Sequence, residues 1–246
     1  MDVTCIILAA GKGVRMKSEV PKVFHEILGK PMLSYVLQAA FDLDIKDIFV
    51  VIGHQSEVIR NFYRRLPITF VLQSEQLGTA HAVMQVEPVL KNLSSPVLVL
   101  NGDMPLIRTE TLGRLVDEHG SKGSKATILT AIMDNAGSFG RIVRDKSGEI
   151  IRIVEQKDAN EEELKIREIN TGTYVFERDA LFSALHEVKP LNVQKEYYLT
   201  DCIELLRKKG YRISSASVLE SLEATGINTR EELEMVERIM LERSHE

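Results

Sequence analysis

The chain has 246 residues, of which 44% are hydrophobic and 27% are charged. These proportions are those of an ordinary globular protein, and they exclude a disordered chain or a small disulfide scaffold. The formal net charge of −5 at pH 7 argues against a nucleic-acid-binding surface, which would carry a strong excess of Lys and Arg.

The first half of the chain alternates compact apolar runs with amphipathic runs, which is the pattern of βα units that feed a parallel sheet. Strands are predicted at 3–8, 47–52, 68–72 and 96–100. Helices are predicted at 32–43, 56–65, 79–90 and 109–119. Strands and helices therefore alternate over this half.

The pattern changes after residue 125. Strands are predicted at 126–133, 141–144, 149–155, 173–176 and 211–218, and helices at 179–186 and 200–208. The segment Asp145-Lys146-Ser147-Gly148 predicts the turn of an antiparallel hairpin. Thr229, followed three residues later by Glu232, predicts a capping box that opens a terminal helix.

The sequence has no internal repeat, low-complexity tract or flexible linker. We therefore expect an α/β domain over 1–228, with halves of about 1–124 and 125–228, followed by a helical arm over 229–246. Ligands of open α/β sheets gather at the carboxyl ends of the strands, so the cleft between the halves is the expected site.

The cysteine content and the N-terminus indicate the compartment. The only cysteines, Cys5 and Cys202, lie in an apolar run and a helical pattern, so we expect two buried thiols in a reducing cytosol. The sequence has no signal-peptide pattern and no apolar run of membrane-spanning length. A cytoplasmic protein without membrane contact is expected.

A glycine-rich loop directly follows the first predicted strand. Gly11 and Gly13 allow a sharp turn that brings backbone N–H groups close to phosphate oxygens, and Lys12, Arg15 and Lys22 add positive charge. The loop lacks the Lys-Ser/Thr ending of a Walker loop, and Met16 stands where a dinucleotide fingerprint has its third glycine. Taken alone, the loop is either a phosphate site or an ordinary turn.

Two further loops follow predicted strands. Asp103 comes just after the fourth strand, where it is either a ligand for a hard cation or a turn former. The segment from Gln73 to Ala80 follows the third strand, and its amides and hydroxyl could read the edge of a pyrimidine or simply begin a helix. No zinc-binding His pair, Cys-x-x-Cys or serine nucleophile elbow is present.

The run Leu8-Ala9-Ala10-Gly11-Lys12-Gly13-Val14-Arg15-Met16, with Pro21-Lys22 after it, resembles the signature of the nucleoside-diphosphate-sugar pyrophosphorylases. The resemblance is nearest to the uridylyltransferase domain of the bacterial bifunctional N-acetylglucosamine-1-phosphate enzymes. It continues through 73–81, Gly102-Asp103, 168–172, 196–201 and 226–228, and so covers nearly the whole chain.

This resemblance implies a Rossmann-like three-layer nucleotidyltransferase fold with a mixed, mostly parallel sheet and a smaller acceptor-binding lobe. The first half would bind the nucleotide and the second half the sugar. The implied reaction is in-line attack of N-acetylglucosamine 1-phosphate on the α-phosphorus of UTP, with release of pyrophosphate and no covalent enzyme intermediate.

The resemblance also assigns roles to individual residues. Catalysis would use Arg15, Lys22 and Asp103, and Mg²⁺ would be held by Asp103 and Asn228. The implied nucleotide-binding residues are Leu8, Ala9, Ala10, Gly11, Gly13, Gln73, Gly78, Thr79, Asn101 and Gly102. The implied sugar-binding residues are Gly140, Glu155, Asn170 and Asn228, with the cluster from Glu196 to Asp201 shaping the acceptor pocket.

The sequence departs from the resembled enzymes at two points. Asn101 stands where they carry Tyr before Gly-Asp, and the chain ends at Glu246 without their hexapeptide-repeat β-helix. Because trimerisation of those enzymes relies on the β-helix, we expect a monomer or weak dimer. The alternatives are a pyrophosphorylase for another sugar or nucleotide, a silent sugar-nucleotide sensor and a nicotinamide dehydrogenase.

Overall fold

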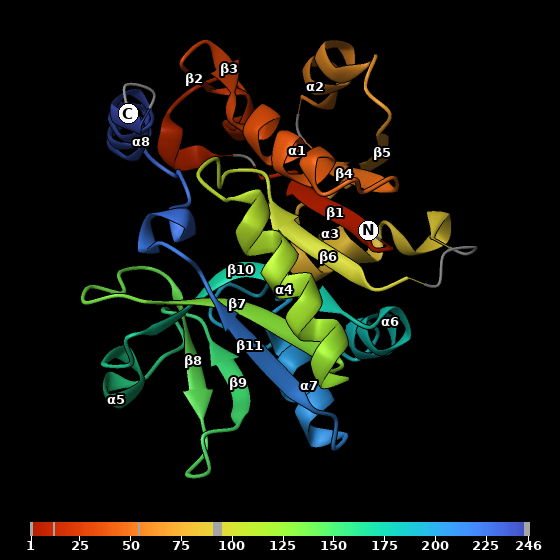
Figure 1. The fold of residues 1–246 in the computed structure, drawn as a ribbon, viewed down its shortest axis with the longest axis vertical. Helices are drawn as coiled ribbons and strands as arrows, with labels where there is room; N and C mark the ends of the chain where they lie inside the picture. The colour runs from red at the N-terminus through yellow and green to blue at the C-terminus, as the bar shows by residue number, and fades with distance from the viewer. Residues whose placement is uncertain (1, 12, 54, 91–94, 244–246) are drawn as a thin grey trace.

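The computed structural model describes residues 2–11, 13–53, 55–90 and 95–243, and it has a central sheet with helices on both faces (Figure 1). The main strands are β1 (Thr4–Ala9), β4 (Ile48–Ile52), β5 (Thr69–Leu72), β6 (Val97–Asn101), β7 (Ala126–Ile132), β10 (Glu168–Phe176) and β11 (Ile213–Ser217). Their order is β11-β7-β10-β6-β1-β4-β5. Only β10 pairs antiparallel with its neighbours along this path, so the expected mixed, mostly parallel sheet is confirmed.

Two hydrophobic cores flank the sheet because successive side chains of a strand point to opposite faces. In β1, Ile6 belongs to the core that contains residues of α3 (Thr79–Met84), α6 (Arg178–Leu185) and α7 (Asp201–Lys208). Cys5 and Ile7 belong to the core that contains residues of α1 (Met32–Asp42), α2 (Ser56–Tyr63) and α4 (Thr109–Lys122). Burial on both faces explains the continuous apolar runs of the sequence.

The second half adds a hairpin to the sheet. Strands β8 (Gly140–Arg144) and β9 (Ile150–Val154) pair antiparallel, and the backbone N–H of Gly148 donates to Asp145 O at 3.0 Å, so the predicted turn is confirmed. β8 also pairs with β10, where Gly140 lies opposite Asn170. A short helix, α5 (Glu161–Leu164), follows β9 and begins with a capping box at Asn160.

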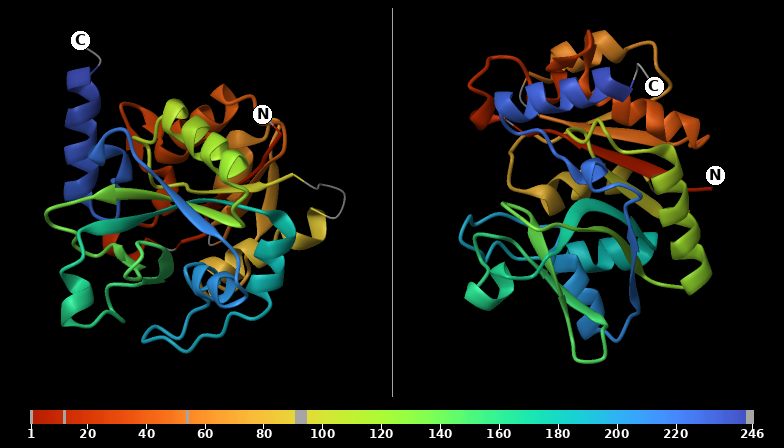
Figure 2. Two further views of the ribbon diagram at one scale, coloured as in Figure 1. Left: turned by 60° about the horizontal axis from the view of Figure 1, so that its bottom comes forward. Right: turned by 60° about the vertical axis from the view of Figure 1, so that its left-hand side comes forward.

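The last helix, α8 (Arg230–Arg243), lies at the margin of the molecule beside the small hairpin of β2 (Glu26–Ile27) and β3 (Lys30–Pro31) (Figures 1 and 2). Val236 of α8 is buried in a cluster with Ile27, Met32 and Ile227. The predicted capping box is confirmed, because the N–H of Glu232 donates to Thr229 Oγ1 at 3.2 Å and Thr229 N donates to Glu232 Oε2 at 3.0 Å.

Several predicted boundaries are wrong. The helix expected over 79–90 ends at Met84 and is followed by a 3₁₀ turn, η3 (Glu87–Val89), because Pro88 lacks the N–H that a continuing helix needs. The strand expected at 173–176 begins at Glu168. The β2–β3 hairpin, α5 and a 3₁₀ turn, η4 (Ser221–Ala224), were not predicted.

Two other expectations concern the cysteines and the membrane. Cys5 and Cys202 are both buried free thiols, as expected. Of the helices in the described ranges, none is long and apolar enough to cross a membrane.

Candidate active site

The carboxyl ends of β1 and β6 meet at one edge of the sheet. The two strands are parallel neighbours, with Leu8 opposite Asn101. The chain leaves β1 into the glycine loop and leaves β6 into Gly102 and Asp103, and Gly102 N donates to Leu8 O at 2.9 Å. Strand pairing therefore brings the two predicted loops together.

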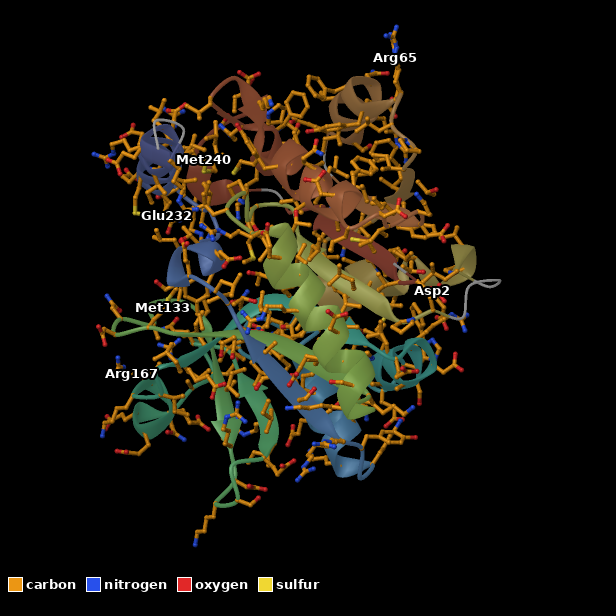
Figure 3. All side chains as sticks on the ribbon, in the orientation of Figure 1. Asp2, Arg65, Met133, Arg167, Glu232 and Met240 are labelled. Atoms are coloured by element: carbon orange, nitrogen blue, oxygen red, sulfur yellow. The ribbon has the colours of Figure 1, made fainter. Side chains whose placement is uncertain are left out.

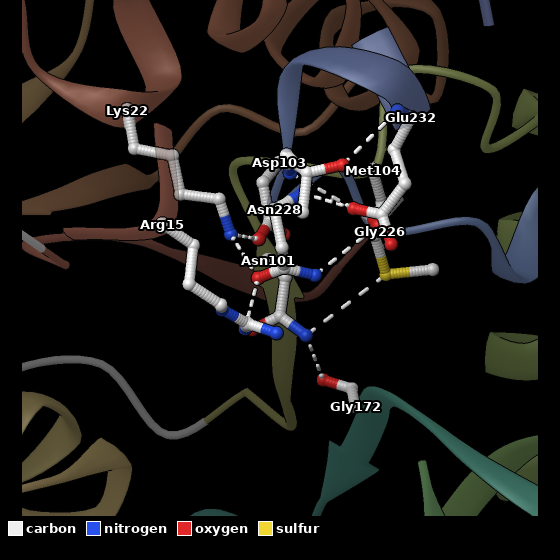
Figure 4. Close-up of polar contacts among 10 residues, drawn as sticks. Arg15, Lys22, Asn101, Asp103, Met104, Gly172, Gly226, Asn228 and Glu232 are labelled. Carbon is white, nitrogen blue, oxygen red and sulfur yellow. Dashed lines mark hydrogen bonds and ion pairs between the residues drawn. The ribbon is translucent and has the colours of Figure 1, made fainter. Parts of the chain in front are cut away.

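Asp103 contacts the ammonium group of Lys22, which lies in the 3₁₀ turn η2 (Lys22–Phe24). Lys22 Nζ also donates to Asn228 Oδ1 at 2.7 Å, and Arg15 Nη2 donates to the same oxygen at 2.7 Å (Figure 4). The Lys22 and Asp103 side chains are only 12% and 21% exposed. The four residues that the resemblance assigns to catalysis and metal binding thus form one polar cluster.

Asn228 is positioned by the last helix. Its backbone N–H donates to Glu232 Oε2 at 2.5 Å, and Glu232 lies near the start of α8 (Figure 3). On the other side, Ile227 N donates to Asp103 O at 3.0 Å. The sequence indicated Glu232 only as a helix cap, but its carboxylate also holds the backbone of a site residue.

The glycine loop is shaped around Lys22. Gly13 has a φ of +61°, and a Cβ atom built on it would lie 2.6 Å from Lys22 Cβ. A larger residue at this position would therefore be strained in its backbone and would displace the lysine. Lys12, which the sequence indicated as a further cation, lies outside the described residues.

A carboxylate and an amide oxygen are ligands that hard divalent cations accept. Here the Lys22 ammonium group, itself a cation, already contacts the side-chain oxygens of both Asp103 and Asn228. In the part of the chain that the structure describes, no group of three or more His, Cys, Asp or Glu could hold a metal ion. The two oxygens therefore lie close enough together, and are of the right kind, to hold one divalent cation.

A first cavity, of about 530 Å³, opens on the β1 and β5 side of this cluster. Eight of the ten residues assigned to the nucleotide line it, whereas Gly13 and Gly102 do not. The full lining is Leu8, Ala9, Ala10, Gly11, Lys22, Val23, Gln73, Gln76, Gly78, Thr79, Ala82, Asn101, Asp103 and Glu196.

The Gln73 amide is fixed inside this first cavity. The residue is 3% exposed, and its Nε2 donates to Gly78 O at 3.1 Å and lies 3.1 Å from His81 Nδ1. Thr79 accepts the backbone N–H of Leu199 at 3.0 Å. These contacts hold the polar groups of Gln73 and Thr79 in defined positions in the cavity wall.

A second cavity, of about 440 Å³, adjoins the first and contains all four residues assigned to the sugar, which are Gly140, Glu155, Asn170 and Asn228. Arg15 and Asp103 line it as well. The two cavities share four residues, which are Leu8, Thr79, Asn101 and Asp103. The polar cluster around Asp103 therefore lies where the two cavities meet.

The second cavity is backed by buried polar contacts. Burial raises the pKa of Glu155, and a hydrogen bond from Thr200 Oγ1 at 3.2 Å partly offsets this shift. Asn170 Nδ2 donates to the hydroxyl of Tyr174 at 2.7 Å, and Tyr174 is 2% exposed. Thr200 belongs to the cluster from Glu196 to Asp201 that the resemblance links to the acceptor pocket, and it lines this cavity. Tyr174 was not singled out from the sequence, since it reads locally as an ordinary strand residue.

Asn101 lies at the junction of the two cavities. Its Nδ2 donates to Gly172 O of β10 at 3.4 Å (Figure 4). The contact links the end of β6 to the antiparallel strand of the second half. Asn101, which departs from the resembled enzymes, thus also connects the first half of the chain to the second half at the site.

Another cavity, of about 740 Å³, lies beyond Glu155 and Thr200, which it shares with the second cavity. None of Arg15, Lys22, Asp103 and Asn228 lines it. The polar cluster therefore lies apart from this cavity, at the junction of the first and second cavities.

A family model described as nucleotidyl transferase matches residues 4–218, which is most of the chain. The chain belongs to the nucleotidyl transferase family. The matched range contains the glycine loop, Lys22 and Asp103, whereas Asn228 lies beyond its end.

Curated proteins resemble the chain over its full length. It is 46% identical over 243 residues to the bifunctional protein GlmU of Pelotomaculum thermopropionicum, covering 99% of this chain and 53% of that protein. It is 44% identical over 245 residues to the bifunctional protein GlmU of Syntrophomonas wolfei, covering 100% of this chain and 54% of that protein. The chain therefore spans about half the length of the curated relatives it matches.

A solved structure supports the nucleotidyl transferase fold. The crystal structure of UDP-glucose pyrophosphorylase complexed with UDP-glucose superposes with a TM-score of 0.79 over 99% of this chain and 100% of that chain. The two sequences are 18% identical. The expected α/β nucleotidyltransferase fold is confirmed.

Proposed function

We propose that this chain transfers a uridylyl group from UTP to N-acetylglucosamine 1-phosphate, giving UDP-N-acetylglucosamine and pyrophosphate. The observation that carries the proposal is the position of Asp103 and Lys22, where two adjoining cavities meet. A transferase that joins two substrates needs this arrangement, because the reacting groups must meet at a shared boundary. The choice of substrates follows from the resemblance of the sequence to the uridylyltransferase domain of the bacterial bifunctional N-acetylglucosamine-1-phosphate enzymes.

In this proposal the first cavity holds the uridine. Backbone from Leu8 to Gly11 lines one wall, and Gln73, Gly78 and Thr79 line the other. The buried Gln73 amide has its Nε2 engaged by protein groups, so its position is fixed before a base enters. A fixed amide can select a base by hydrogen bonds, because a wrong base would leave buried polar groups unpaired.

The second cavity holds the sugar. Glu155 and Asn170 offer carboxyl and amide groups suited to hydroxyl and acetamido groups. A Cβ atom on Gly140 would lie 3.2 Å from Ile153 Cγ2 and 3.5 Å from both carboxylate oxygens of Glu155, so the glycine leaves room for the ring beside Glu155. These groups lie on β8, β10 and the end of β9, so the second half of the chain supplies the acceptor pocket.

The chemistry is in-line displacement at phosphorus. A phosphate oxygen of the sugar 1-phosphate forms a bond to the α-phosphorus of UTP as the bond to the pyrophosphate oxygen breaks. Lys22 and Arg15 place positive charge beside the reacting phosphates, and no protein nucleophile is required. Preorganised charges of this kind stabilise a transition state by about 2.7–4 kcal/mol each.

We propose that Asp103 and Asn228 hold Mg²⁺. Their oxygens converge on the Lys22 ammonium group, so they lie close enough to share one cation. When bound, Mg²⁺ would supply positive charge that offsets the negative charge of the phosphates. Arg15 and Glu232 keep Asn228 in position for this role through its Oδ1 and its backbone N–H.

The test is a pyrophosphate-release assay with Mg²⁺, each of the four nucleoside triphosphates and a panel of sugar 1-phosphates. We expect release to be fastest with UTP and N-acetylglucosamine 1-phosphate. A preference for glucose or glucosamine 1-phosphate, or for another nucleotide, would favour a different pyrophosphorylase. The absence of release with every pair would favour a sugar-nucleotide sensor.

We also propose that the chain works in the cytoplasm as a monomer or weak dimer. Two buried free thiols are consistent with a reducing compartment. Light scattering measures the oligomeric state, and a stable trimer would contradict this part of the proposal.

A further inference from the structure

A further, cation-rich cavity, here the basic cavity, adjoins the proposed active site. It has a volume of about 560 Å³ and is lined by Arg15, Met16, Lys17, Thr229, Arg230 and Glu231. Three of these six side chains are cations and one is a carboxylate, although the chain as a whole has a net charge of −5. A local excess of positive charge on an acidic protein favours an anionic ligand.

Arg15 connects this basic cavity to the reacting centre. It lines both the basic cavity and the second cavity, and its guanidinium group donates to Asn228. A linear anion that begins at the Asp103 cluster and passes Arg15 would therefore enter the basic cavity. The β- and γ-phosphates of a nucleoside triphosphate form such an anion.

Lys17 and Arg230, the two cations of this cavity that lie outside the proposed active site, each occupy a position that is unfavourable for their backbone or charge. Lys17 has a φ of +49°, in the left-handed region that side chains other than glycine rarely adopt. Arg230 is the first residue of α8, where the helix dipole disfavours positive charge. Two departures from local preference that face one cavity indicate a functional requirement there.

The three cations of the basic cavity are not neutralised by ion pairs, but the Glu231 carboxylate lies near two of them. Within the described residues, Arg15, Lys17 and Arg230 form no ion pair with a carboxylate within 4.0 Å. The pKa of Glu231 is lowered by its own backbone N–H, by the Thr229 hydroxyl and then by the charges of Lys17 and Arg230. The Glu231 carboxylate therefore lies within the field of both cations and opposes an incoming anion.

We propose that Lys17 and Arg230, together with Arg15, bind the β- and γ-phosphates of the triphosphate and the pyrophosphate that leaves. The inference rests on the proposed nucleotidyl transfer and adds a site for its leaving group. Lys17 and Arg230 are positioning residues, because they bind the end of the polyphosphate that is remote from the α-phosphorus and do not contact the reacting atoms. Glu231 weakens the hold and favours release of the product.

The first experiment measures binding of inorganic tripolyphosphate to the full chain by calorimetry at fixed ionic strength. It compares Lys17→Gln, Arg230→Gln and Glu231→Gln, with Lys146→Gln as the control, since Lys146 is exposed in the β8–β9 turn away from the cavity. We expect Lys17→Gln and Arg230→Gln to weaken binding about fivefold or more each. Glu231→Gln should tighten binding about threefold, and Lys146→Gln should leave it unchanged.

The opposite sign expected for Glu231→Gln separates a specific cavity from a loss of folding. Equal affinities in all the variants, or a Lys146→Gln effect as large as that of Lys17→Gln, would overturn the proposal. So would a wild-type chain that does not bind tripolyphosphate. This readout needs no catalysis, so its result is independent of whether any substrate pair gives pyrophosphate release.

The second experiment uses the turnover assay to distinguish bound triphosphate from free pyrophosphate. The Lys17→Gln and Arg230→Gln variants should raise KM for the nucleotide and the inhibition constant of pyrophosphate by similar factors, with KM for the sugar 1-phosphate unchanged. A change in pyrophosphate inhibition alone would restrict the site to the product. An equal rise in KM for the sugar would contradict the assignment.

Discussion

Replacing Asp103 with Asn removes one negative charge from the centre of the site and leaves the shape of the side chain almost unchanged. The Lys22 ammonium group, whose side chain is 12% exposed, would keep Asn228 as a partner but lose its carboxylate contact. The site would also lose the carboxylate that we assign to the metal. Both changes weaken the neutralisation of phosphate charge.

The structure sets the expected magnitude of each effect. Two unit charges about 4 Å apart near a protein surface attract by about 4 kcal/mol, and the cost of desolvation removes most of this gain. The loss of folding stability should therefore be modest, about 1–2 kcal/mol. Loss of a preorganised charge in the transition state costs about 2.7–4 kcal/mol, so turnover should fall about 100- to 1,000-fold.

The assay is pyrophosphate release at saturating substrates over a range of Mg²⁺ concentrations, with a thermal melt of each variant. Asp117→Asn is the matched control, because Asp117 is exposed on α4 and loses the same charge. Asp103→Asn should melt within a few degrees of the wild type and turn over far more slowly. A kcat within about threefold of the wild type, with the same Mg²⁺ dependence, would refute the role of Asp103.

Three further perturbations test residues in and around the site, namely Glu232, Gly78 and Asp201. Glu232→Ala removes the acceptor for Asn228 N and Thr229 N, so it should cost about 1 kcal/mol of stability and lower kcat about tenfold as Asn228 loses its anchor. Exposed Glu234 on α8 provides the control variant, Glu234→Ala, which should change neither. Gly78→Ala should destabilise the fold by about 2 kcal/mol or more, since φ is +114° and the new Cβ would lie 2.4 Å from Tyr197 O. Its control is Gly120→Ala in α4, where a Cβ meets no atom within 4 Å and unfolding measurements should show no loss. Burial and then the charges of Glu204 and Asp158 raise the pKa of Asp201 from 3.8 to about 6. The folded chain therefore holds this proton to a higher pH than the unfolded chain, and stability is lost as the pH rises from about 4 to about 6. Thermal melts across this range should show the wild type losing stability relative to Asp201→Asn, and parallel curves would contradict the shift.

The sequence by itself determined the local elements of the site. Unbroken apolar runs predicted the buried parallel strands, because a strand covered on both faces needs apolar residues at every position. Gly11 and Asp103 could be placed at strand ends from those runs alone. Thr229 and Glu232 predicted the start of α8, since a capping box depends on residues three positions apart. Pro88 also carries a local signal for the end of α3, because proline lacks the backbone N–H that a continuing helix needs, although a continuous helix over 79–90 was predicted.

Tertiary structure decided which of these local features meet. Lys22 and Asn228 are 206 residues apart and come together only because the chain returns from β11 to the end of β6. The reversed direction of β10, the division of the site into two cavities and the use of Glu232 to hold Asn228 arise in the same way. Hydrophobic periodicity and secondary-structure propensity depend on residues that are neighbours along the chain. The order of the strands, and which side chains meet, depend instead on the packing of the whole domain. The basic cavity of Arg15, Lys17 and Arg230 exists only because the start of α8 lies beside the end of the glycine loop.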